Sequence, residues 1–158
     1  MMKGSDMTRK KHPVIEYESY LFSIISSKLF YDFSGYNACD RGIYSEYMSL
    51  ELSAECFLPP KENATLFELV FLGSRDMERD LYDQEYLDEK MSPIGRLTVK
   101  KGARKFLGTL PADSLWHVAR AIDRGSFKSI VLHGEKARYG RAKIISADFS
   151  MSHDPDDL

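Results

Sequence analysis

The chain has 158 residues, of which 43% are hydrophobic, and its 22 basic and 24 acidic side chains nearly cancel. This length suits one domain, and this composition excludes a wholly disordered chain. Two cysteines cannot build a disulfide framework, and the polar, basic N-terminus is not followed by the apolar region of a signal peptide. We therefore expect a cytoplasmic protein with reduced thiols and no membrane partner.

Residues 1–12 are predicted to form a disordered basic leader. Residues 13–150 are predicted to form a single β-rich domain, and the acidic residues 151–158 a flexible tail. The domain opens with residues 14–31, which are rich in Ile, Tyr, Phe and Leu. This composition predicts one long bent strand, or two strands with a break near Ser26.

The clearest pattern lies between Met48 and Cys56, where apolar side chains hold every even position and Ser or Glu holds every odd one. Successive side chains of a strand point to opposite faces, so residues 44–56 predict a strand with one buried face and one solvent-facing face. Pro59 marks a turn, because proline cannot donate to a central ladder. The apolar run 66–72 then predicts a central strand.

The second half of the chain predicts one helix among further strands. Pro111 suits the first turn of that helix and Gly125 its end, while Leu115 and Ala119 belong to a single apolar stripe. The predicted elements are a short acidic helix or loop at about 74–91, a hairpin of strands 94–100 and 104–109, the amphipathic helix at about 111–124, and strands 127–133 and 139–149 joined by a turn at 134–136.

These elements together predict a mainly β (β-rich α+β) fold. With about seven strands and one helix, an antiparallel β-sandwich or a flattened barrel is expected, with the helix covering one end.

Charge is divided unevenly along the chain. Residues 13–94 hold sixteen acidic and six basic side chains, whereas residues 95–147 hold three acidic and twelve basic ones. If strands from the two halves interleave in the fold, neighbouring charges neutralise one another. If they do not, the division favours charged partners or head-to-tail self-association.

Catalytic and metal-binding signatures are missing from the sequence. The four histidines are scattered, and no zinc, phosphate-loop, dinucleotide or nucleophile-elbow motif occurs. Asp113 and His117, four residues apart on the predicted helix, are expected to make a surface contact rather than a general base. Cys39 is expected to be an ordinary loop cysteine. We therefore predict no catalytic residue, no metal and no cofactor.

The favoured function is a non-enzymatic interaction module that binds another protein or a second copy of itself as a homodimer. The first alternative is a nucleic-acid binder that uses a basic face of the C-terminal half, with an aromatic side chain for base stacking. The second alternative is an enzyme whose site is assembled from distant strands. Tyrosines crowd the first third of the chain and fill the core or form a contact surface. The candidate partner-binding residues are Lys100, Lys101, Arg104, Lys105, Arg138, Tyr139, Arg141, Lys143, Trp116 and Arg120.

Overall fold

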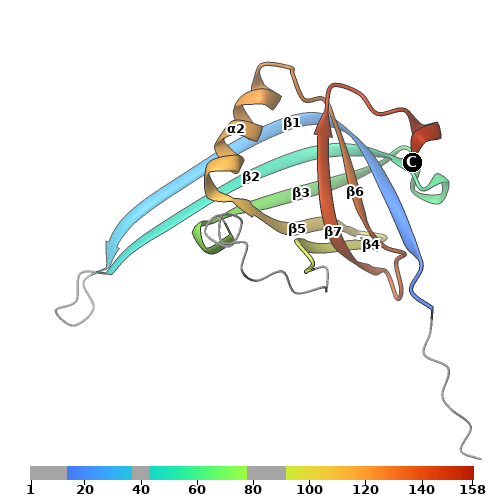
Figure 1. Cartoon of the computed structure of the whole chain (residues 1–158), viewed down its shortest axis with the longest axis horizontal. Coiled ribbons are helices and arrows are strands. Elements are labelled where there is room, and N and C mark those ends of the chain that lie inside the picture. The colour runs from blue at the N-terminus through green and yellow to red at the C-terminus, as the bar shows by residue number, and fades with distance from the viewer. Residues whose placement is uncertain (1–13, 37–42, 78–91) are drawn as a thin grey trace, which may run out of the picture.

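A computed structural model describes residues 14–36, 43–77 and 92–158. Its strands form one closed barrel, with the helix α2 lying across one opening (Figure 1). The elements are β1 (Tyr17–Tyr36), β2 (Ile43–Leu58), η1 (Pro60–Glu62), β3 (Thr65–Ser74), β4 (Gly95–Lys100), β5 (Ala103–Pro111), α2 (Ala112–Asp123), β6 (Ser129–Glu135), β7 (Arg141–Ser150) and η3 (Pro155–Asp157). The prediction of a mainly β fold with about seven strands and one amphipathic helix is confirmed, and the sheet is a barrel.

The barrel order is β1-β2-β3-β5-β4-β7-β6, with β6 pairing back to β1. Every neighbouring pair is antiparallel except β3 and β5, which run parallel. The chain leaves β3, skips one place to form β4, and returns through a tight hairpin as β5. The strands of the first half, β1 to β3, therefore stay together, and β4 to β7 make up the rest of the wall.

The alternating segment of β2 lines the core as predicted, because Leu50, Leu52, Ala54 and Cys56 are all buried. Phe106 of β5 fills the space beside Gly95 and Gly108. A Cβ atom on Gly108 would lie 2.3 Å from the Phe106 ring. Ala112, Leu115 and Ala119 of α2 are buried against the same cluster. The helix thus closes the barrel with the predicted apolar stripe.

The two longest strands extend beyond the barrel. β1 pairs with β6 only from Tyr17 to Ser23, and β2 pairs with β3 only from Ser49 onward. Residues 28–36 of β1 and 43–48 of β2, called the arm below, therefore form a two-stranded projection (Figure 1). The sequence predicted that β1 ends near Tyr31. In the structure it continues to Tyr36, and cross-strand aromatic pairs stabilise the added length.

One alternative that the sequence left open is decided, and one boundary differs from the sequence prediction. β1 is one strand, with a register shift between Ile24 and Ser26 at the place where a break was considered. The predicted turn at 134–136 is wrong, because Gly134 lies within β6 and the chain turns at Tyr139 and Gly140 instead. Those two residues adopt φ of 52° and 74°, the left-handed backbone that a tight hairpin turn needs.

Some predicted features lie outside the described residues or remain untested. Residues 75–77 are helical, but the rest of the predicted acidic helix or loop is not described, nor are Cys39 and the leader 1–12. The flexibility of the tail stays a prediction; within it, His153 Nδ1 lies 2.7 Å from Ser129 Oγ. No helix in the described part of the chain has the length and apolarity needed to cross a membrane.

Candidate interaction surfaces

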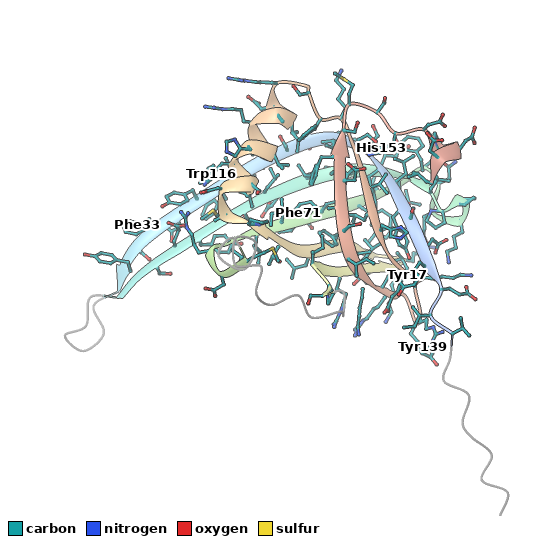
Figure 2. All side chains as sticks on the ribbon, in the orientation of Figure 1. Tyr17, Phe33, Phe71, Trp116, Tyr139 and His153 are labelled. Carbon is teal, nitrogen blue, oxygen red and sulfur yellow. The ribbon has the colours of Figure 1, made fainter. Side chains whose placement is uncertain are left out.

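The arm exposes large apolar side chains on both of its faces. Six of them leave between 43% and 73% of their surface open to solvent. They are Leu29, Phe30, Tyr31, Phe33, Tyr44 and Tyr47. Figure 2 shows Phe33 near the far end of the arm, at a distance from the barrel. The predicted tyrosine surface is therefore present in part, since Tyr31, Tyr44 and Tyr47 point outward while Tyr20 is buried.

Both faces of the arm carry aromatic pairs. Phe33 and Tyr44 stack on one face, with ring centroids 5.6 Å apart, and Phe30 and Tyr47 meet edge to face on the other at 5.8 Å. These are diagonal cross-strand neighbours in the β1–β2 register, a spacing that aromatic side chains can bridge. The pairs stabilise the ribbon and keep its rings at the surface.

A charged clamp connects the arm to α2 through Arg75. Arg75 Nη2 lies 3.1 Å from Glu46 Oε1, and Arg75 Nη1 lies 3.4 Å from Asp113 Oδ1. Tyr31 donates a hydrogen bond to the Glu46 carboxylate at 3.3 Å. Partial burial of the Tyr31 ring and the adjacent Glu46 charge together raise the pKa of that hydroxyl. Asp113, predicted to contact His117, is thus engaged by Arg75.

A cleft of about 500 Å³ lies between α2 and the base of the arm, where Ser27, Leu29 and Leu50 line it. Trp116 lines it and packs against Tyr31 with ring centroids 5.6 Å apart. Arg120 also lines it, so two predicted partner-binding residues share this site. The cleft's titratable side chains are His117, Arg120 and Asp123, all from α2. The cleft is therefore not the site assembled from distant strands that the enzyme alternative requires.

A second surface, called the basic face below, lies on the outside of β4, β5 and β7. It consists of Arg96, Lys105, Arg141 and Lys143, all exposed. In the sheet register Arg96 pairs with Lys143, and Thr98 lies between Lys105 and Arg141. Side chains at directly opposite positions point to the same face, so the four cations share one side of the wall.

A groove of about 750 Å³ runs along the basic face. Its apolar lining comes from Leu72, Pro93, Ile94 and Leu107. Its cations are Arg96, Lys105 and Lys143. The groove therefore combines an apolar floor with a positive rim.

The division of charge along the sequence survives folding because the strands of the two halves do not interleave. The halves meet along two seams of the barrel, β3 with β5 and β1 with β6. Among the described residues, three ion pairs cross these seams: Lys105 to Glu68 at 3.9 Å, Arg104 to Glu62 at 3.3 Å and Lys136 to Glu16 at 3.3 Å. Charges of the two halves therefore neutralise each other at the seams. The basic face lies in the wall between the two seams.

The ten predicted residues do not form one surface. Lys105, Arg141 and Lys143 lie on the basic face, and Trp116 and Arg120 lie at the arm cleft. The other five lie around the β4–β5 and β6–β7 turns; they are Lys100, Lys101, Arg104, Arg138 and Tyr139. Figure 2 places Tyr139 at the end of the molecule opposite Phe33.

Several of the turn residues already have partners within the chain. Arg104 pairs with the buried Glu62 carboxylate, and Arg138 Nη2 donates to the Val14 carbonyl at 3.2 Å. The Lys100 stem packs over Gly140. Tyr139, in contrast, is 95% exposed.

The sequence prediction omitted Arg96 and the aromatic residues of the arm. Arg96 could have been predicted from alternation, because it precedes the buried Leu97 in a strand whose other outward-facing residues are polar. For the arm, alternation could not tell a covered face from an open one. That difference depends on which strands continue beside β1 and β2.

Possible reactive centres are sparse in the part of the chain that the structure describes. No group of three or more His, Cys, Asp or Glu side chains there could hold a metal ion. Cys56 is fully buried, and burial together with the Glu62 charge raises the pKa of its thiol to about 12. A buried thiol of that kind is a poor nucleophile at neutral pH.

Comparison with known protein families, with curated proteins and with solved structures found no match to this chain.

Proposed function

We propose that this chain is a non-enzymatic interaction module, and that its docking surface is the arm. The observation that carries the proposal is the set of six large apolar side chains exposed on one projecting ribbon. Large apolar side chains gathered at the surface in this way are costly in water and typically mark a contact site for another macromolecule.

The shape of the arm favours a protein partner over a small ligand. Small-molecule sites are usually concave and enclose their ligand, whereas the arm projects and carries rings on both faces. Aromatic side chains contribute much of the binding energy at protein interfaces, because they bury a large area at little conformational cost. The partner is another protein or a second copy of the chain, and a cytoplasmic location remains part of this proposal.

The arm is also preorganised for binding. Pairing of Phe33 with Tyr44 fixes the rings, and Arg75 ties Glu46 of the arm to Asp113 of α2. An isolated two-stranded hairpin is marginal in water, so this support matters. A preordered surface loses less conformational entropy on association.

Site-specific photo-crosslinking in the native host tests the proposal. A photoreactive residue replacing Phe33 should give protein adducts that disappear when Tyr44→Ser is added. The matched control places the same residue at Tyr139, which is 95% exposed at the opposite end of the molecule. The proposal fails if position 33 yields no adduct, or if positions 33 and 139 give the same adducts.

Nucleic-acid binding is the second candidate, favoured by the alignment of Arg96, Lys143, Lys105 and Arg141 on neighbouring strands. Such binding weakens steeply with salt, because phosphate contacts release counterions. A labelled single strand of about 20 nucleotides should then be retarded at low salt. The double variant Arg96→Glu, Lys143→Glu should abolish the shift, and an unshifted wild type rejects this candidate.

A further inference from the structure

We infer that the groove on the basic face receives the arm of a second copy of this chain, so that molecules associate head to tail. This inference rests on the proposed function of the arm and names its partner. The arm and the groove complement each other in polarity, in charge and in position.

The arm supplies exposed aromatic rings and the exposed carboxylate of Asp32. Among its described residues, Asp32 and Glu46 are acidic and Lys28, at its base, is basic. Asp32 is exposed, and in the register it lies opposite Tyr47 and next to Phe33. Because Glu46 is already paired with Arg75, a docking arm would present the Asp32 carboxylate beside the Tyr47 ring.

The groove supplies the matching groups. Its apolar residues can receive rings, with Leu107 already 49% exposed on the groove floor. Arg96 and Lys143 on the rim can pair with carboxylates through charge-assisted bonds. Arg96 can also lie over an aromatic face, an attraction that strengthens when water is excluded.

The arm points away from β4 and β5, so its tip cannot occupy the groove of its own molecule (Figure 1). A second molecule can present its arm there, and its own groove then remains free. Such an interface joins two different surfaces, so it propagates into a ring or an open chain rather than stopping at a dimer.

The strength of the contact can be estimated from the arm. Six half-exposed side chains that each bury about 150–250 Å² when fully covered would add roughly 500 Å². This lies below the roughly 800 Å² per partner of a standard stable interface. Association is therefore expected to depend on concentration, and to weaken with salt because the groove rim is charged.

Light scattering with two complementary variants tests the inference. The arm variant carries Phe33→Ser and Tyr44→Ser, and the groove variant carries Arg96→Glu and Lys143→Glu. The wild type should gain mass with concentration at low salt and lose it at high salt. Each variant alone should associate at least about tenfold more weakly, as expected when interface anchors are removed.

The decisive sample is an equimolar mixture of the two variants. One variant keeps a working groove and the other a working arm, so the mixture should form a one-to-one dimer and nothing larger. An exchange of charges gives a second check. The Lys143→Glu variant should associate weakly, and adding Asp32→Lys to it should restore association, because the two charges of the pair are then reversed together. Thermal melts establish that each variant is folded, and the charge-matched control Lys61→Glu, Arg124→Glu should behave as the wild type.

Three results would overturn the inference. If the wild type stays monomeric at all concentrations, the head-to-tail inference fails. The proposed function of the arm still holds in that case if crosslinks from position 33 reach a different protein. A wild type that assembles while the mixed variants do not form dimers points to an arm-to-arm contact instead. If the wild type is monomeric and binds a nucleic-acid single strand, and only the groove variant loses that binding, the groove is assigned to nucleic acid.

Discussion

At the scale of single residues, Cys56 shows how burial changes chemistry in the barrel wall. Its thiol is fully buried and donates to the Leu58 carbonyl at 3.0 Å. Burial, followed by the nearby Glu62 charge, raises the pKa of the thiol from 9.0 to about 12. The neutral form is therefore strongly favoured in the folded state.

This raised pKa predicts alkaline destabilisation. Stability from the neutral thiol is complete below pH 9, the ordinary titration range, and falls as pH rises toward 12. Urea unfolding of Cys56→Ala should show a loss of about 1–2 kcal/mol at pH 7 from the smaller side chain. Between pH 9 and 11 the wild type should lose more stability than the variant. Equal losses of stability in both proteins would show that Cys56 does not cause the destabilisation between pH 9 and 11.

At the scale of elements, close approach of β6 and β7 depends on Gly134. A Cβ at this position would lie 2.2 Å from the Lys143 carbonyl oxygen and 2.8 Å from the Ile144 Cα. Both are backbone atoms that cannot move aside without breaking the strand pairing. Gly102, in the β4–β5 turn, differs because a Cβ there would meet nothing within 4 Å, although its φ is 82°.

The two glycines form a matched pair for mutagenesis. Gly134→Ala should destabilise the protein by about 3 kcal/mol through overpacking. Gly102→Ala should cost about 1 kcal/mol, since only its left-handed backbone is strained. Chemical denaturation of both variants measures the difference. Equal destabilisation would mean that β7 can shift outward to admit a methyl group.

At the scale of the whole molecule, strand order keeps opposite charges apart. The acidic first half forms one side of the barrel and the basic second half the other, joined at two seams. Had the strands alternated around the barrel, the same sequence would have formed a neutral mosaic. The arm and the basic face are thus products of topology as much as of composition.

Much of the fold could be predicted from local pattern. Alternation between Met48 and Cys56 identified a strand and its buried face, and Leu115 with Ala119 identified the contact side of the helix. The errors came from tertiary contacts. Gly134 resembles a turn residue in sequence, but its missing side chain serves strand packing.

The candidate sites were less predictable. Arg104 and Lys105 are adjacent cations in the sequence, yet Arg104, on the same strand face as the buried Phe106, pairs with the buried Glu62, whereas Lys105 lies on the basic face. Alternation separates the two faces but does not identify Glu62 as the partner. The role of Trp116 in partner binding stays a prediction, and its neighbour Tyr31 comes from a strand 85 positions earlier. Sequence spacing cannot reveal such a pairing.

By itself, the sequence determined that this protein is a mainly β domain with one amphipathic helix and two halves of opposite charge, because periodicity and composition are local properties of the chain. Only the tertiary structure decided that the sheet closes into a barrel, that β1 and β2 continue past it, and that four cations share one face. These features depend on which strands pair and where the pairing stops, and such contacts join residues far apart in sequence.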